Sequence, residues 1–367
     1  MNSTDEYLNK ISELTNDLMK QEIIISKTSK LPDFHNLEDS KTLTKLRNGI
    51  RENSIISLYT IWESFVKGVI FETIFYNQGL LNNDYTLTKM ISKVNSNNFL
   101  SSSFYKLEQN NIVLTKNVLT HSNNMSMNAF YCILEDFKFE RNDLFSHINI
   151  GPRTDSFSKI TLNQLKVNAP INTIDSNDNL KLPKDPSDLV KFYHEKIFEL
   201  VKFRNIAAHS DNRNEIWSLD SISTMADILK SLMITIDEYL IGQIIKRTIA
   251  LSSDTDGVKK INTTNVYPKY SALEINPPEN IRGRNINDFI FFAKDRQRKI
   301  FREIKVEKLK NLRRNTCKNI PKTGLCSVQI NAIDLWSLKK NKEELYIYKG
   351  TFNKHNFVIN VTIEDLF

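Results

Sequence analysis

One long apolar periodicity constrains the fold of this chain more than any other feature. Between residues 43 and 69, apolar side chains recur mostly every three or four positions. They are Leu43, Leu46, Ile50, Ile55, Leu58, Trp62, Phe65, Val66 and Val69. This spacing places them on one face of an α-helix. A second run of the same kind extends from about Leu219 to Arg247. Helices of this length need partners for their apolar faces, so the pattern favours a helical bundle.

Two further segments extend the helical pattern. Residues 5–28 carry apolar positions at helical spacing before Pro32 interrupts them. Further along, Asp185 suits a helix N-cap and Pro186 the first helical position, ahead of an apolar stripe that begins at Leu189. The chain contains only nine glycines and nine prolines, which favours long helices over a turn-rich β architecture. We therefore expect a mainly α protein.

The length of 367 residues predicts two domains. A polar stretch of small residues around 251–257 separates the helical pattern from the tail. We expect a helical domain over 1–252 and a smaller, basic α+β domain over 253–367. Periodicity is weak between about 80 and 182, and we interpret this part as an elaboration inserted into the bundle.

The tail combines a helical pattern with strand patterns. The segment 287–313 is rich in Lys and Arg and predicts a basic helix, whereas 324–335 and 344–361 resemble strands, the second with the two halves of a hairpin. From residue 282 to residue 318, thirteen Lys and Arg face four acids. This part alone carries +9, against a net charge of +7 for the whole chain. Electrostatic attraction for nucleic acid is therefore expected mainly in the tail.

Four cations of the expected basic helix are candidates for binding RNA or a partner protein. They are Arg296, Arg298, Lys299 and Arg302. Such a contact would neutralise phosphates without reading the bases. The alternative is a solvated face, which is the usual role of a run of charges.

The most reactive combination of side chains lies at the end of the segment that begins at Leu189. Arg204 carries a permanent charge on a planar fork of donors that matches a phosphate. His209 can accept or donate a proton near neutral pH. On a helix, Asn205 and His209 lie four positions apart on one face, with Arg204 adjacent. RNA carries its own nucleophile, the 2′-hydroxyl, so cleavage without a metal needs a proton-transfer group and a cation.

This motif and its context resemble the HEPN domain family, an all-α family that includes RNA-cleaving toxins and defence nucleases. The family's signature is an arginine, usually followed by a polar residue, and a histidine a few positions later. Arg204, Asn205 and His209 match it. An earlier Trp-Glu helix, from Tyr59 to Lys67, is similar to that of several prokaryotic HEPN subfamilies. The resemblance covers roughly the first two-thirds of the chain and implies a HEPN-like helical bundle. It also implies a metal-independent endoribonuclease in a toxin or anti-phage role.

The resemblance implies partners as well. In HEPN ribonucleases two motifs face each other across an interface, and one convincing copy is present here, so we expect a homodimer with a composite site. RNA is the expected substrate, and a cognate inhibitor or sensor protein is the expected control. The competing interpretation is a non-catalytic RNA-binding or assembly module of a larger complex.

Several candidate residues have structural alternatives. Glu63 is placed either to neutralise and orient Arg204 or to pair with Lys67 one helical turn away. Arg141 and His147 also fit the loose spacing of the motif, but the weak periodicity before them favours a loop or cap. The motif itself could be structural, because cations in the last turn of a helix interact with its dipole and cap its carbonyls.

Motifs for other enzyme classes are missing from the sequence. It has no His-Glu-x-x-His pattern, no phosphate-cradling Gly-rich loop and no Gly-x-Ser-x-Gly elbow. Cys132, Cys317 and Cys326 form neither a disulfide framework nor a metal-type pair of pairs. We expect no cofactor and no metal. Without a signal peptide or an apolar run of about 18 residues, we also expect a cytoplasmic protein with no membrane partner.

Overall fold

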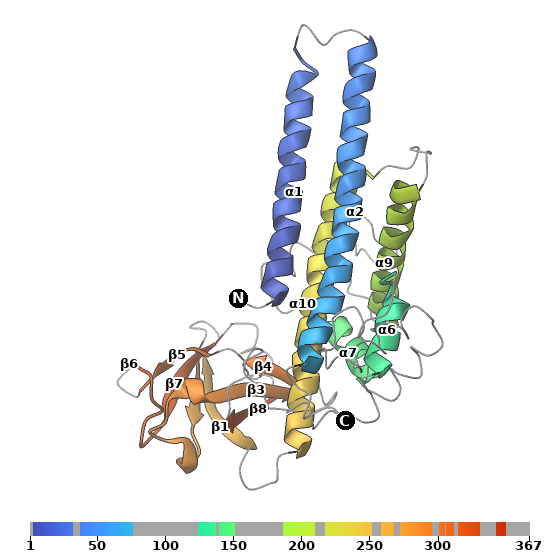
Figure 1. Ribbon diagram of the computed structural model, residues 1–367. Helices are drawn as coiled ribbons and strands as arrows, with labels where there is room; N and C mark the ends of the chain where they lie inside the picture. Colours follow the sequence, from blue (N-terminus) through green and yellow to red (C-terminus); the bar gives the residue numbers. More distant parts are fainter. Residues whose placement is uncertain are drawn as a thin grey trace, which may run out of the picture.

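The computed structural model places helices in the first part of the chain and strands in the tail (Figure 1). The described residues are 3–31, 37–75, 124–136, 139–150, 186–209, 217–251, 258–267, 272–295, 301–304, 306–311, 315–330 and 343–349. The helices are α1 (Ser3–Thr28), α2 (Leu37–Phe75), α6 (Met127–Asp136), α7 (Arg141–Ile150), α9 (Pro186–His209) and α10 (Leu219–Leu251). The strands are β1 (Val258–Tyr267), β2 (Ala272–Asn276), β3 (Phe289–Asp295), β4 (Phe301–Ile304), β5 (Val306–Lys310), β6 (Thr316–Cys317), β7 (Cys326–Ile330) and β8 (Glu343–Lys349).

The four long helices are those that the apolar periodicity predicts, and α9 begins at Pro186 as expected. Helix α2 contacts α1, α9 and α10, so its apolar face is covered from several sides. Helices α6 and α7 lie within the predicted elaboration, and the rest of that segment lies outside the described residues. Among the described helices, none is long and apolar enough to cross a bilayer.

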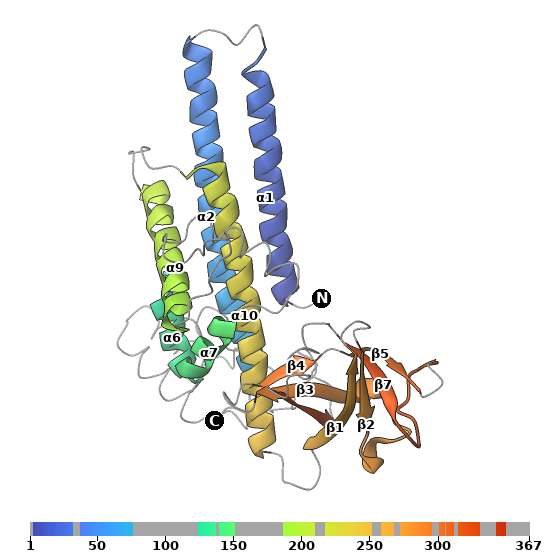
Figure 2. The same ribbon diagram turned by 180° about the vertical axis from the view of Figure 1, so that it is seen from behind.

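Helices α1 and α2 project beyond the ends of α9 and α10 (Figure 2). Near this end a buried carboxylate on α1, Glu22, joins the two helices. It pairs with Nε of Arg47 at 3.0 Å and with Nε of Arg51 at 2.5 Å. Sliding one helix along the other would separate these ion pairs and leave buried charge unpaired, which is unfavourable. The contacts therefore favour the observed register of α1 and α2.

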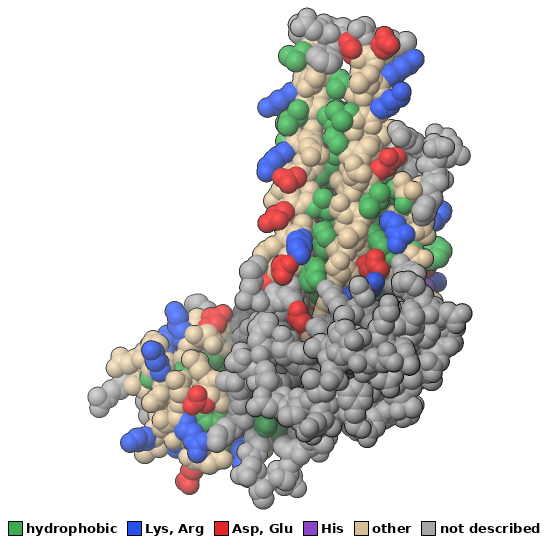
Figure 3. Space-filling view, in the orientation of Figure 1, with side chains coloured by type: hydrophobic (Ala, Val, Ile, Leu, Met, Phe, Trp, Pro, Cys, Tyr) green, Lys and Arg blue, Asp and Glu red, His purple; other side chains and the backbone are tan. Residues whose placement is uncertain are grey.

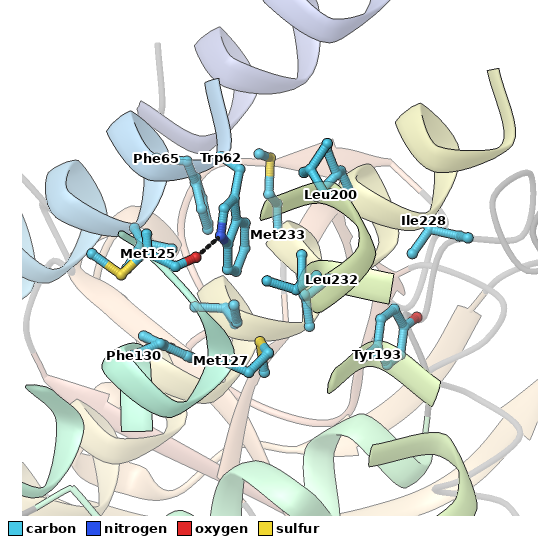
Figure 4. Close-up of a cluster of buried hydrophobic side chains, with 14 of the residues drawn as sticks. Trp62, Phe65, Met125, Met127, Phe130, Tyr193, Leu200, Ile228, Leu232 and Met233 are labelled. Atoms are coloured by element: carbon cyan, nitrogen blue, oxygen red, sulfur yellow. Dashed lines mark hydrogen bonds between the residues drawn. The ribbon is translucent and has the colours of Figure 1, made fainter. Parts of the chain in front are cut away.

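The helical core is built around Trp62 (Figure 4). Its indole is fully buried, and its Nε1 donates a hydrogen bond to the backbone oxygen of Met125 at 2.8 Å. Phe65 and Phe130 pack against its ring, with centroid distances of 6.3 and 6.5 Å. Burying each such side chain stabilises the fold by about 1.5–3 kcal/mol. The prediction that Trp62 belongs to the core, and is not a platform for base stacking, is confirmed.

The described strands form one antiparallel sheet in the order β4-β3-β8-β1-β2-β7-β5-β6. One face buries a second apolar core, which includes Leu273, Phe291 and Ile347. Opposite sides of β3 are both covered, since Ile290 and Phe292 are buried as well. The chain changes from helix to strand between Leu251 and Val258, near the predicted boundary. The division into two domains stays a prediction.

The sheet packs against α10 at a glycine. A Cβ atom on Gly242 would overlap the backbone oxygen of Phe301 in β4 and would lie 3.4 Å from Nε2 of His147 in α7. Glycine therefore permits a close approach of helix and strand backbones that a larger residue would prevent.

The predicted basic helix over 287–313 is wrong. This segment contains a single 3₁₀ turn, Ile286–Asp288, at its start and then strands β3, β4 and β5, and the described part of the tail has no α-helix. Five consecutive residues from Phe289 to Ala293 are buried, as expected for a strand covered on both faces. Strand β3 pairs with β8 along its whole length, and this distant partner overrides the local preference of Lys and Arg. The strand predictions for 324–335 and 344–361 are confirmed where described, by β7 and β8.

Of the four cations assigned to that helix, one has a described backbone. Arg302 is in β4, opposite Ala293 of β3, and its side chain lies outside the described part. Arg296, Arg298 and Lys299 lie outside the described residues. The second half of the predicted hairpin, after Lys349, also lies outside them.

Candidate functional site

Helix α9 carries the predicted motif in its last two turns. A buried stripe of Tyr193, Ile197 and Leu200 fixes this helix in the bundle, and α9 continues to His209. Arg204 follows that stripe and is half-buried. The side chain of His209 lies outside the described part of the structure.

Three groups hold the guanidinium of Arg204. Its Cζ lies 4.1 Å from the centre of the Tyr59 ring, which comes from α2. Its Nη1 donates to Oδ1 of Asn205 at 2.8 Å, and its Nη2 donates to Oδ1 of Asn124 at 3.1 Å. Asn124 belongs to the segment that leads into α6. The cation is thus oriented by an aromatic face and two amide oxygens, which come from three different segments.

The groups that hold Arg204 are themselves fixed by backbone contacts. The hydroxyl of Tyr59 accepts a hydrogen bond from the backbone N–H of Met125 at 2.9 Å. Trp62, one turn further along α2, binds the backbone oxygen of the same residue. Two side chains of α2 therefore bind the backbone N–H and the backbone oxygen of Met125. Because Asn124 precedes Met125 in the chain, these bonds also fix the backbone next to Asn124. Burial raises the pKa of Tyr59, so its phenol stays neutral in the physiological range.

Glu63 does not pair with Arg204. Its Oε1 lies 2.9 Å from Nζ of Lys67, one turn further along α2. This is the alternative that the spacing allows, and it is favoured because both side chains start from the same helix face. In the described part of the chain, no carboxylate pairs with Arg204. The described residues therefore orient this cation without a direct carboxylate partner.

The second candidate motif does not form a comparable group. The segment is not a loop, because Arg141 begins helix α7 directly after the turn at Glu140. Arg141 stacks on Tyr131 at 4.7 Å and pairs with Glu135 at 2.9 Å. His147 is instead buried against Tyr239 of α10, with ring centroids 5.7 Å apart. The cation of this pair is neutralised and its histidine belongs to the core.

Sequence reasoning missed the roles of two residues in the Arg204 site. Tyr59 lies on the helix that carries the Trp-Glu resemblance, but nothing in the spacing indicates that its ring meets Arg204. Asn124 follows no periodic pattern and is 80 positions from Arg204. Its contact could be found only from the packing. No group of three metal-ligating side chains is present among the described residues.

A protein-family model matches the helical part of the chain. The family model described as RiboL-PSP-HEPN matches residues 5–242. The chain belongs to this HEPN family. The HEPN match begins in α1, includes the Arg204 site and ends inside α10, so the sheet lies outside it. Membership indicates an RNase-type or RNA-related function. No curated protein and no solved structure matches the chain.

Proposed function

We propose that this HEPN chain is a metal-independent endoribonuclease in which Arg204 binds the scissile phosphate and His209 transfers a proton. The contacts of the Arg204 guanidinium are the observation that supports this proposal most. The guanidinium is oriented by neutral groups, and its described partners include no carboxylate. A half-buried cation without a counter-charge attracts an anion more strongly than a paired one. A phosphate can accept two parallel hydrogen bonds from it.

In the proposed reaction, the 2′-oxygen of a nucleotide attacks the adjacent phosphorus while the bond to the 5′-oxygen breaks. A base takes the 2′-hydroxyl proton and an acid protonates the leaving oxygen, so the products are a 2′,3′-cyclic phosphate and a 5′-hydroxyl. His209 serves one of these roles, which is worth roughly 10²–10⁴-fold in rate. Arg204 stabilises the charge that develops on the phosphate. Asn205 acts through Arg204, since its oxygen accepts a hydrogen bond from Nη1.

A single histidine supplies one of the two proton transfers, so a second copy of the chain completes the proposed site. The motif ends α9, and Ala208 beside the histidine is exposed to solvent. This position at the end of the helix is therefore accessible to a partner. We propose a homodimer in which two such ends meet. Resemblance to HEPN toxins and defence nucleases supports a toxin or anti-phage role for this activity, under the control of an inhibitor or sensor protein.

The experiment compares the parent protein with Arg204→Ala and His209→Ala, using labelled RNA in the presence of EDTA. Cleavage should persist with EDTA, fall at least 100-fold in both variants, and leave a cyclic phosphate end. Light scattering on the same samples should give a dimer. Cleavage that survives both substitutions, or that EDTA abolishes, would remove this mechanism, and a strict monomer would remove the composite site.

One observation favours a second candidate, a HEPN module that binds RNA without cutting it. The ring of Tyr59 on α2 lies 4.1 Å from Cζ of Arg204, and such a contact also suits a cation whose role is to anchor α9 to α2. This candidate predicts RNA binding that weakens steeply with salt and no cyclic phosphate product. The same assay separates the two candidates.

A further inference from the structure

Two segments of the tail pair into a short ribbon outside the named strands. Gly283 N donates to the oxygen of Ile320 at 2.7 Å, and Ile320 N donates to the oxygen of Arg284 at 2.8 Å. Ile286 N donates to the oxygen of Lys318 at 2.9 Å. We call residues 282–286 and 318–322 the basic ribbon.

The ribbon contains a β-bulge that a glycine makes possible. Two consecutive residues, Gly283 and Arg284, lie opposite the single residue Ile320, and Gly283 has φ +76°. This arrangement needs a left-handed residue at the first position, which glycine adopts without strain. Bulges re-aim the side chain that follows them. Arg284 is accordingly exposed although its partner Ile320 is buried.

Arg282 fixes the ribbon. Its Nη1 donates to the backbone oxygens of Pro321 at 3.3 Å and Gly324 at 2.8 Å, and its Nη2 donates to Oδ1 of Asn276 in β2 at 2.9 Å. The ribbon is therefore tied to the sheet before any ligand binds. Less conformational freedom is then lost on binding, which favours affinity.

Three further cations of the ribbon are exposed: Arg284, Lys318 and Lys322. Within the described residues none of them takes part in an ion pair. The stem of Lys322 lies along Gly283, with its Cγ 3.6 Å from the position of a Cβ there. Other exposed positions around the ribbon, such as Asn319 and Thr323, are polar. A protein interface has an apolar centre, which this surface lacks, so it fits a polyanion better.

We propose that the basic ribbon binds the phosphate backbone of RNA. The inference rests on the proposed function in one respect, that RNA is the ligand of this protein. Several Lys and Arg side chains, with a few acids among them, lie on the visible face of the tail sheet (Figure 3). The sheet and α9 lie on opposite sides of α10 in both views (Figures 1 and 2). The ribbon therefore holds RNA at a second place, apart from the cleavage site, and contributes affinity without base specificity.

The test measures binding of fluorescent oligouridine by anisotropy, in full-length protein that carries His209→Ala so that bound RNA stays intact. The ribbon variant combines Arg284→Gln, Lys318→Gln and Lys322→Gln. Each phosphate contact on a single strand contributes about 0.7 to the slope of log K against log salt. The slope should fall by about 2, and the affinity at about 0.1 M salt should fall roughly 100-fold.

A matched control combines Lys27→Gln, Lys41→Gln and Lys45→Gln, three exposed positions on the projecting part of α1 and α2. It removes the same charge and should leave the slope nearly unchanged. The ribbon proposal is overturned if the ribbon variant keeps the parent slope, if the control loses as much, or if the parent does not bind RNA. If Arg204→Ala and His209→Ala still cleave while the ribbon variant loses affinity, the ribbon stands and the cleavage mechanism fails.

Discussion

Replacing Tyr59 in two ways separates its two contacts. Tyr59→Phe removes the hydroxyl that accepts the N–H of Met125 and keeps the ring beneath Arg204. Tyr59→Leu removes both the hydroxyl and the ring. The two variants therefore differ mainly in whether the guanidinium of Arg204 keeps the aromatic face that lies 4.1 Å from its Cζ.

The expected losses follow from these contacts. Met125 is fully buried, so an unpaired N–H there should lower the free energy of unfolding by about 1–3 kcal/mol in both variants. A half-buried cation–π contact is worth about 1–2 kcal/mol. If that contact orients Arg204 in the transition state, its loss should slow cleavage by about 5- to 30-fold in Tyr59→Leu. Tyr59→Phe, which keeps the ring, should cleave faster than Tyr59→Leu.

Urea unfolding and initial cleavage rates, both measured well below the melting temperature, give the two quantities separately. Tyr193→Phe is the matched control. Its hydroxyl lies 2.7 Å from Oγ of Ser231, joining α9 to α10, and it does not contact Arg204. This variant should lose stability by about 1 kcal/mol and keep its cleavage rate.

Equal cleavage rates in Tyr59→Phe and Tyr59→Leu would refute the assignment of the ring to Arg204. A cleavage defect in Tyr193→Phe as large as that of Tyr59→Leu would show that the assay responds to general loosening of the bundle. Neither result could be reconciled with a cation that the ring holds in place.

Two further predictions concern backbone packing and charge. Gly242→Ala should lower the free energy of unfolding by about 1–2 kcal/mol, because its methyl group would overlap the backbone of Phe301. Gly49→Ala should raise the free energy of unfolding by about 0.5–1 kcal/mol, because no atom lies within 4 Å of its Cβ position. Thermal unfolding checks both, and shifts of equal sign would contradict the close approach at Gly242. Glu63→Gln should cost about 0.3–0.5 kcal/mol through the lost Lys67 pair and leave cleavage unchanged. A cleavage loss as large as that of Arg204→Ala would contradict the pairing seen here.

The fold was predictable where local periodicity and burial coincide. Leu58, Trp62 and Phe65 repeat at helical spacing and are all buried, so sequence alone located α2. The segment 287–313 failed because Lys and Arg tolerate either secondary structure, and pairing between β3 and β8 decides the outcome. That pairing joins Phe291 to Ile347, and no local pattern reports a partner so far along the chain.

In the candidate site, too, contacts within one helix were predictable from the sequence and contacts between segments were not. Arg204 and Asn205 were found because they are neighbours on one helix, where chemistry and spacing can be judged together. The partner of Glu63 remained open between Lys67 and Arg204, because helical spacing allows the first and does not exclude the second. Asn124 carries no signal in the sequence, since its contact depends on how the segment before α6 crosses α2.

The energetic balance at Arg204 separates anchoring from anion binding. The dipole at the end of α9 contributes about 0.3–1 kcal/mol, and the ring of Tyr59 about 1–2 kcal/mol, so a purely structural arginine would be adequately held. Neither of these two contacts adds a negative charge next to the guanidinium of Arg204. A phosphate about 4 Å away would gain about 4 kcal/mol at an effective dielectric of about 20, against about 1 kcal/mol in water. That attraction would be largely cancelled if Glu63 faced Arg204, whereas Glu63 pairs with Lys67. Among the described residues, the ion pair on α2 thus leaves Arg204 oriented but without a carboxylate partner, which is the state that the proposed phosphate binding needs.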